Sequence, residues 1–188
     1  MNEYKRSAGH SRPLRSAGRD FSCHIRRPVV SDGAGVHCLI AGSPPLDANS
    51  MYCNLLQCTH FADTCVVAEV ESEVAAFLSA YRKPDDLQVM FVWQIAVAES
   101  FRGRGLASRM LHELMQRPAA RQVNYLETSI TPSNRASSIL FERFAQNHAA
   151  TFTKSILFSK AEHFAGKHED EVLFRIGPFS NSKNYPNN

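Results

Sequence analysis

Hydrophobic positions are most concentrated between Met90 and Val97, where nearly every residue is apolar. Such a run is typical of a strand that is covered on both faces at the centre of a sheet. After it, apolar positions recur with the i, i+3, i+4, i+7 spacing of one helical stripe. This spacing predicts an amphipathic helix over 104–116, which Pro118 ends. The stripe consists of Ala107, Met110, Leu111 and Leu114.

Other apolar runs predict a mixed α/β domain without internal repeats. Three further helices are expected, the first from a cap at 31–32 to Gly42. The second is capped by Asn49 or Ser50, and 131–134 opens the third. Residues 82–86 form a polar loop before the central strand. Further strands are expected at 21–29, 64–70, 74–81, 123–130, 155–158 and 172–176. The helical residues expected to face the core are Val36, Leu39, Ile40, Met51, Leu55, Cys58, Ala136, Leu140 and Phe144.

Charge separates the first twenty residues from the rest of the chain. Residues 1–20 hold five cations against two anions, which accounts for the whole net charge of +3. We predict that this basic segment is a disordered tail. Residues 21–179 are predicted to form one domain, and residues 180–188 a flexible C-terminal tail. Without a folded basic face, no nucleic-acid partner is expected. No apolar run approaches 18 residues, so no membrane span is expected either.

The five cysteines are odd in number and contain no C-x-x-C pair. They therefore predict neither a disulfide framework nor a zinc site, and they indicate a cytoplasmic protein. Cys53, Cys58 and His60 could be imagined as metal ligands, but buried cysteine in a helix is the favoured interpretation. We expect no metal.

The turn between the central strand and its helix reads Arg102, Gly103, Arg104, Gly105, Leu106, Ala107. Two glycines allow a tight bend close to a ligand, and the first helical N–H groups attract anions. The spacing fits neither G-x-G-x-x-G nor the P-loop. It resembles the acyl-coenzyme A pyrophosphate loop of the Gcn5-related N-acetyltransferases (GNAT), and the order of predicted elements matches that fold. The resemblance implies a mixed sheet of about seven strands flanked by about four helices.

Four separated blocks narrow the resemblance to the L-2,4-diaminobutyrate acetyltransferases of ectoine synthesis, a route to osmoadaptation. The resemblance covers roughly residues 21–179. It implies transfer of acetyl from acetyl-coenzyme A to the 4-amino group of L-2,4-diaminobutyrate by a homodimer. The blocks are PPLDANSMYCNLLQCTHFADTC at 44–65, FVWQIAVA at 91–98, LETSITPSN at 126–134 and HFAGKHEDEVLFRIGP at 163–178.

The resemblance also implies how the coenzyme is bound. Strand amides of Ile95, Ala96 and Val97 pair with the pantetheine arm, and the 102–107 turn takes the pyrophosphate. Asn134 stands at the position of the family-wide asparagine near the pantetheine. Its alternative role is plain capping of the following helix.

A cationic diamine requires carboxylates. Glu127 lies within an apolar strand, where a carboxylate is rare unless it is paired or functional. We therefore predict that Glu127 binds the substrate or acts as the catalytic base. The alternative is a structural ion pair. Asp47 is the second candidate, with an Asx turn as its alternative. Trp93 and Tyr52 are predicted to contact the substrate, with simple packing as the alternative, and Thr128 beside Glu127 completes the predicted substrate set.

Proton transfer to the leaving thiolate has no evident donor. Many relatives place a tyrosine seven residues after the motif asparagine, where this chain has Phe141. Tyr52, a water or His168 could replace it; loop hydrogen bonding is the alternative for His168. A covalent route through Cys53 or Cys58 lacks an activating cation. We therefore favour direct attack of the amine on the thioester in a ternary complex. Two other functions compete with this prediction: acetylation of another small diamine or amino acid, and non-catalytic sensing of acyl-coenzyme A.

Overall fold

The computed structural model describes residues 22–44 and 46–179. The predicted tails at 1–20 and 180–188 lie outside the described residues. The order of strands and helices is the predicted one, with seven strands and four α-helices. In chain order these are β1 (Cys23–Arg26), α1 (Gly33–Ala41), α2 (Met51–Gln57), β2 (Val66–Val70), β3 (Glu73–Lys83), β4 (Asp86–Val97), α3 (Leu106–Gln116), β5 (Tyr125–Ile130), α4 (Arg135–Asn147), β6 (Phe152–Phe158) and β7 (Glu171–Ile176).

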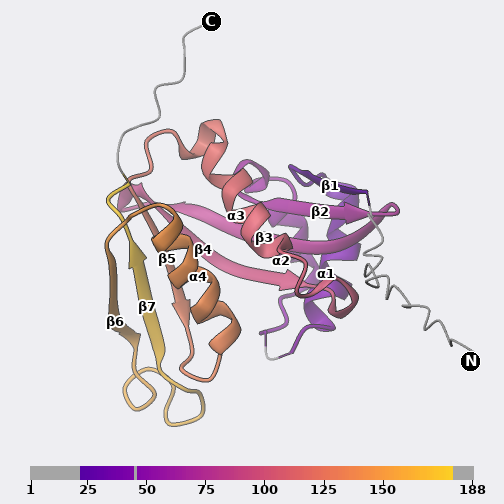
Figure 1. Ribbon diagram of the computed structural model, residues 1–188. Helices are drawn as coiled ribbons and strands as arrows, with labels where there is room; N and C mark the ends of the chain where they lie inside the picture. The colour runs from indigo at the N-terminus through magenta and orange to yellow at the C-terminus, as the bar shows by residue number, and fades with distance from the viewer. Residues whose placement is uncertain (1–21, 45, 180–188) are drawn as a thin grey trace, which may run out of the picture.

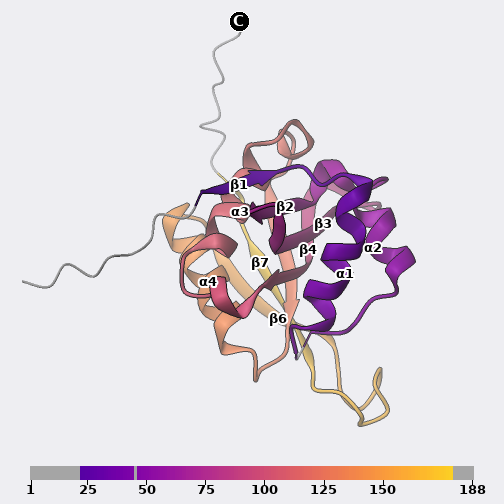
Figure 2. The ribbon, with the colours of Figure 1, turned by 90° about the vertical axis from the view of Figure 1, so that its right-hand side faces the viewer.

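One seven-stranded sheet forms the middle layer, in the order β1-β2-β3-β4-β5-β7-β6. All neighbouring strands are antiparallel except β4 and β5, which run parallel. The helices lie on both faces, with α1 and α2 on one side and α3 and α4 on the other (Figure 2). Each helix pair covers its own apolar cluster, and the larger cluster lies under α3 and α4.

The central strand is β4, as predicted, but it is not covered on both faces. Pairing with β3 shifts by one residue between Val92 and Gln94, so Trp93 is the extra residue of a β-bulge. Its side chain is 52% exposed. The apolar run could not reveal this, because a bulge reverses which residues face the core without changing their hydrophobicity.

Several predicted boundaries and faces are wrong. The polar loop at 82–86 is only a two-residue turn, because β3 extends to Lys83 and β4 begins at Asp86. The first strand spans four residues rather than nine. In α2, the predicted inward Met51 is exposed, whereas the polar Asn54 and Gln57 are buried and hydrogen-bond each other. In α4, Ala136 is exposed and the buried positions are Phe141, Phe144 and Ala145.

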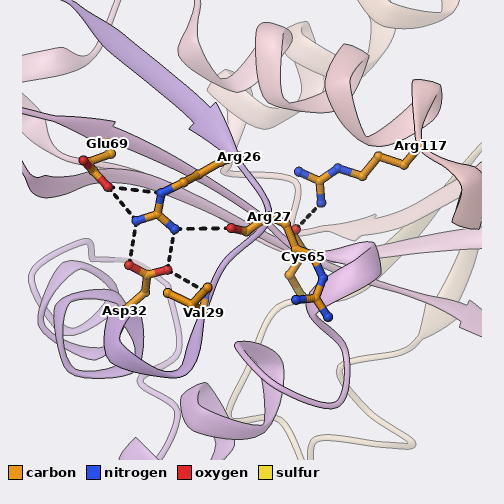
Figure 3. A network of polar contacts seen from close by, with 7 residues as sticks. All are labelled: Arg26, Arg27, Val29, Asp32, Cys65, Glu69 and Arg117. Carbon is orange, nitrogen blue, oxygen red and sulfur yellow. Dashed lines mark hydrogen bonds and ion pairs between the residues drawn. The ribbon is translucent and has the colours of Figure 1, made fainter.

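At the predicted helix cap, residues 31–32, Asp32 belongs to an ion-pair network and does not cap α1. Asp32 precedes α1, but its side chain makes no hydrogen bond that caps α1; it accepts the backbone N–H of Val29 at 2.7 Å. It also receives two hydrogen bonds from Arg26 at 2.7 and 2.8 Å, and Arg26 donates to Glu69 at 2.6 Å (Figure 3). The network joins β1, β2 and the start of α1. The Arg26 guanidinium, which hydrogen-bonds to Asp32, holds the pKa of that carboxyl below its usual 3.8.

We expect Asp32→Asn to lower the free energy of unfolding at pH 7 by about 1.5–3 kcal/mol. Because the pKa of Asp32 is lower in the folded than in the unfolded state, its contribution is present above about pH 4 and is lost as the pH falls through the folded value. Urea unfolding at pH 7, 5 and 3 should show the difference between the two proteins shrinking in acid. Asp63→Asn, in the exposed pair with Arg27, serves as the control and should change little. A difference that stays constant down to pH 3 would contradict the assignment.

Candidate active site

The parallel strands β4 and β5 separate after a short contact. Their pairing runs from Val89–Tyr125 to Val92–Thr128, whereas β4 continues to Val97 and β5 to Ile130 (Figure 1). Within the described residues no ladder joins the two strands beyond that point. The β5-facing backbone groups of 93–97 therefore face an opening in the middle of the sheet, because their other edge pairs with β3. Such groups require hydrogen-bond partners. Of the predicted pantetheine contacts, Ile95 and Val97 turn their backbone groups to this edge, whereas Ala96 pairs with Phe77 of β3.

The predicted pyrophosphate turn leads from β4 to α3. Gly103 and Gly105 both have left-handed backbones, with φ of 73° and 75°, and Gly105 is the residue that precedes the helix. A Cβ added at either glycine would meet no atom within 4 Å, so the space beside the turn is open. The first N–H groups of α3, from Leu106 onward, have no intrahelical acceptor and carry partial positive charge, which suits the predicted pyrophosphate contact. Arg102 is exposed, and its Nε donates to the Val97 carbonyl at 3.1 Å, which joins the turn to the open edge of β4.

Two other predicted coenzyme contacts lie close to this turn. Arg104 is exposed and places its guanidinium 5.5 Å from the centre of the Phe101 ring. Ala107 lies in the first turn of α3 and is partly buried. The structure therefore brings the whole 102–107 segment together at one end of α3.

Asn134 begins α4, and its Oδ1 accepts from the Ser137 backbone N–H at 3.1 Å. The capping role that the sequence left as an alternative is therefore present. Its side chain is only partly buried, and this hydrogen bond uses the amide oxygen rather than the two amide N–H donors. The coenzyme contact of Asn134 stays a prediction.

Glu127 is 2% exposed and accepts from two cations. Arg175 Nη1 donates to Oε1, and Lys83 Nζ lies 3.4 Å from Oε2. The alternation of β5 places Leu126 and Ile130 in the core under α3 and α4, so Glu127 faces the other side of the sheet. The buried carboxylate is thus ion-paired, and its charge is held on the face that carries α1 and α2.

The loop that carries Asp47 is fastened to the bulge of β4 by Gln94. Gln94 Nε2 donates to the Asp47 carbonyl at 3.0 Å, and Asn49 Nδ2 donates to Gln94 Oε1 at 2.9 Å. Asp47 itself is exposed. The sequence reasoning missed Gln94, although it is the one polar residue in the run from Met90 to Val97, and that was the available signal.

The other predicted substrate contacts are only partly brought together. Trp93 stands at the bulge next to Gln94, whereas Tyr52 is 70% exposed on α2. Thr128 is buried and, by strand alternation, lies on the opposite face of β5 from Glu127. The side chains of Thr128 and Glu127 therefore point to opposite faces of the sheet.

One of the predicted proton donors, His168, is engaged in loop contacts. His168 Nδ1 lies 2.8 Å from the Glu169 carbonyl, and its ring packs on Phe164 with centres 4.6 Å apart. This is the loop role that the sequence left open. Glu169 in turn accepts from Ser133, which holds the β6–β7 loop against the start of α4. Phe141, where relatives carry tyrosine, is buried in the core under α3 and α4.

Two of the cysteines, Cys58 and Cys65, are unsuited to thiolate chemistry at neutral pH. Burial raises the pKa of the Cys58 thiol to about 11 and that of Cys65 to about 12. Among residues 22–44 and 46–179, no group of three or more histidine, cysteine or acidic side chains could hold a metal ion. No helix in these segments is long and apolar enough to cross a membrane.

A surface cleft of about 710 Å³ lies between β1, α3 and α4, and none of the predicted site residues lines it. Its apolar side is formed by Ile25 and Phe144. Arg109, His112 and His148 line it as well. The cleft lies on the α3 and α4 side of the sheet, whereas Glu127 faces the other side.

Comparison with known proteins decides the family. The Acetyltransferase (GNAT) family profile matches residues 40–145. An L-2,4-diaminobutyric acid acetyltransferase of Methylotuvimicrobium alcaliphilum is 47% identical over 155 residues, which cover 82% of this chain and 90% of the relative. The enzyme of the same name from Vibrio parahaemolyticus is 47% identical over 81% of this chain and 84% of its own. The chain belongs to the L-2,4-diaminobutyric acid acetyltransferase family.

Solved structures agree with this assignment of an L-2,4-diaminobutyric acid acetyltransferase. Diaminobutyrate acetyltransferase EctA from Paenibacillus lautus, solved with its substrate L-2,4-diaminobutyric acid and coenzyme A, superposes with a TM-score of 0.82. It is 41% identical and covers 86% of this chain and 98% of its own. The ribosomal-protein-S18-alanine N-acetyltransferase of Escherichia coli, 15% identical with a TM-score of 0.64 and covering 87% of this chain and 99% of its own, shares the fold alone. The predicted GNAT fold and enzyme class are confirmed.

In this acetyltransferase, the contacts of Gln94 predict that its substitution changes the KM for the diamine but not the KM for acetyl-coenzyme A. We expect Gln94→Leu to raise the KM for the diamine by roughly tenfold, because the loop carrying Asp47 loses both hydrogen bonds to β4. The KM for acetyl-coenzyme A should stay within about twofold, since the open edge of β4 is formed by backbone groups. Steady-state kinetics with each substrate varied in turn measure both constants. An equal rise in the two values would show that the substitution disturbs the strand itself.

Proposed function

We propose that the protein transfers the acetyl group of acetyl-coenzyme A to the 4-amino group of L-2,4-diaminobutyrate, giving N4-acetyl-L-2,4-diaminobutyrate. The observation that carries this is the 47% identity to L-2,4-diaminobutyric acid acetyltransferases over nearly the whole described domain. Two features of the site support it. The opened edge of β4 and the glycine turn suit a nucleotide-bearing thioester, and two carboxylates, on Glu127 and Asp47, suit a substrate with two amino groups.

The reaction follows from direct attack by the neutral amine. The 4-nitrogen adds to the thioester carbonyl carbon, the carbonyl oxygen gains negative charge, and the C–S bond then breaks. The amide forms as the nitrogen loses its proton, and the coenzyme thiolate is protonated. An alkyl ammonium of pKa about 10.4 costs roughly 4–5 kcal/mol to deprotonate at neutral pH, so the site must favour the neutral form or accept its proton.

Glu127 fits substrate binding better than base catalysis. Both of its oxygens already accept from cations, so a proton from the amine would have to displace one of these contacts. We propose that Glu127 supplies negative charge to the amine site. Tyr52, His168 or water remain our proposals for the proton transfers at the 4-nitrogen and the thiolate.

An assay of the purified protein tests the function. Release of free coenzyme A thiol is followed with L-2,4-diaminobutyrate, ornithine, lysine and a polyamine, and NMR of the product locates the acetyl group. We expect L-2,4-diaminobutyrate to be strongly preferred, with acetyl on the 4-nitrogen. Equal turnover of all amines would contradict the specific assignment. Calorimetric binding of acetyl-coenzyme A without turnover of any amine would favour a sensor.

The covalent alternative is tested through the cysteines. We expect Cys58→Ala and Cys53→Ala to retain kcat within about twofold, because direct attack needs no thiol. Cys58→Ala should cost about 1 kcal/mol of stability through the lost buried sulfur. Kinetics and thermal unfolding of both variants check this. A collapse of kcat in either variant while acetyl-coenzyme A still binds would instead support an acyl-cysteine intermediate.

We also propose that the protein is a cytoplasmic homodimer serving osmoadaptation. The family resemblance supports the dimer, and the absence of a cysteine framework supports the compartment. Analytical ultracentrifugation of the purified protein tests the first point. A monomer at all micromolar concentrations would contradict it.

A further inference from the structure

The buried Glu127 has two cationic partners, and neither was expected from the sequence. Lys83 comes from the end of β3, 44 residues away, and Arg175 from β7, 48 residues away. Glu127 is 2% exposed, whereas the side chains of Lys83 and Arg175 are 32% and 35% exposed. The two cations therefore lie between the carboxylate and solvent. Any ligand that reaches Glu127 must contact or displace one of them.

The two cations are held differently. Arg175 donates to Oε1 and places its guanidinium 3.9 Å from the centre of the Tyr125 ring, so it is fixed from two sides. Lys83 Nζ lies 3.4 Å from Oε2, which is at the long limit of a hydrogen bond, and its four-carbon stem is flexible. Lys83 is the partner that can exchange.

The ammonium of Lys83 is also chemically the same group as an amino group of the substrate. A primary alkyl ammonium is already accepted at Oε2, which shows that this oxygen can hold the group. A displaced Lys83 would carry an unpaired positive charge beside the carboxylate. An α-amino acid brings both charges needed for that exchange, since its α-ammonium can take Oε2 and its α-carboxylate can pair with Lys83.

We propose that Lys83 and Glu127 together recognise the α-amino acid end of the substrate, with Lys83 leaving Oε2 to bind the α-carboxylate. Arg175 stays on Oε1 as the fixed counter-ion. This inference rests on the proposed function and deepens it. It explains regioselectivity, because the α-amino group, of lower pKa and therefore easier to deprotonate, is retained at Glu127. The 4-amino group is then the one left to reach the gap between β4 and β5.

Two smaller amines, each of which lacks one charged group of the substrate, distinguish recognition of the α-carboxylate from recognition of the α-amino group. 1,3-Diaminopropane is L-2,4-diaminobutyrate without its carboxylate, and 4-aminobutyrate is the same molecule without its α-amino group. Wild type, Lys83→Met and Lys83→Arg are assayed with all three amines by thiol release at saturating acetyl-coenzyme A. Lys154→Met is the matched control, because Lys154 pairs with Glu142 on α4 at 2.9 Å, away from the site.

We expect Lys83→Met to lower kcat/KM for L-2,4-diaminobutyrate by at least about tenfold without lowering that for 1,3-diaminopropane, which has no carboxylate for Lys83 to bind and competes with Lys83 for Oε2. Lys83→Arg keeps the charge and should recover most of the loss. Lys154→Met should match wild type with every amine. The KM for acetyl-coenzyme A and the thermal unfolding temperature, measured for each variant, confirm that the fold is kept.

Two outcomes would overturn the proposal. An equal fall for L-2,4-diaminobutyrate and 1,3-diaminopropane would show that Lys83 acts only by supporting Glu127. No fall for either amine would show that Lys83 does not contact the substrate. Failure of the proposed function looks different, because wild type itself would then fail to acetylate L-2,4-diaminobutyrate.

Discussion

Replacing Gly105 by valine should raise the KM for acetyl-coenzyme A by roughly tenfold or more and leave that for the diamine nearly unchanged. Gly105 has a φ of 75°, a backbone conformation that costs other L-residues about 1–2 kcal/mol, and more when the side chain is β-branched. No protein atom lies within 4 Å of its Cβ position, so the valine would project into the space that we assign to the pyrophosphate. Initial-rate kinetics with either substrate varied, together with calorimetric titration of acetyl-coenzyme A, measure the effect.

Gly166 provides the control for backbone strain. It has a φ of 77°, an equally open Cβ position, and a place in the β6–β7 loop rather than beside α3. Gly166→Val should therefore lose a similar amount of stability and keep its coenzyme KM. If both variants bind acetyl-coenzyme A equally well, the glycine turn is not the pyrophosphate site.

Replacing Glu127 by glutamine should lower kcat/KM for L-2,4-diaminobutyrate by roughly 100-fold. The substitution keeps the side-chain shape but removes the charge that binds an ammonium group, and it leaves Lys83 and Arg175 facing a cationic substrate without a counter-ion. The KM for acetyl-coenzyme A should change little, because the open edge of β4 and the turn before α3 remain. Full kinetics with both substrates give the two values, and thermal unfolding records the stability lost with the ion pairs.

Asp32→Asn is the matched control for this change. Asp32 is also a buried carboxylate paired with an arginine, but it lies in the network of β1, β2 and α1. The Asp32→Asn variant should lose stability and retain wild-type kinetics. An unchanged kcat/KM in Glu127→Gln would assign Glu127 to the structural ion pair alone.

The parts of the site that are local in sequence could be predicted from it. Gly103 and Gly105 with the following helix form a contiguous signal, because a strand, a tight turn and a helix start need only neighbouring residues. The isolated Glu127 in an apolar strand was likewise visible. Its partners Lys83 and Arg175 were not, because each contributes from a different strand and lay in stretches interpreted as loop or plain strand.

The amino-acid sequence by itself determined the order of strands and helices and the glycine turn, since hydrophobic period and turn residues act over short distances. The GNAT fold followed from the resemblance of that turn and that order to a known family. The tertiary structure alone decided that β7 lies between β5 and β6, that Trp93 forms a bulge, and that β4 and β5 part after Val92. It also decided which side chains surround Glu127. These features depend on pairing between distant segments, for which the hydrophobic pattern of a single segment carries no information.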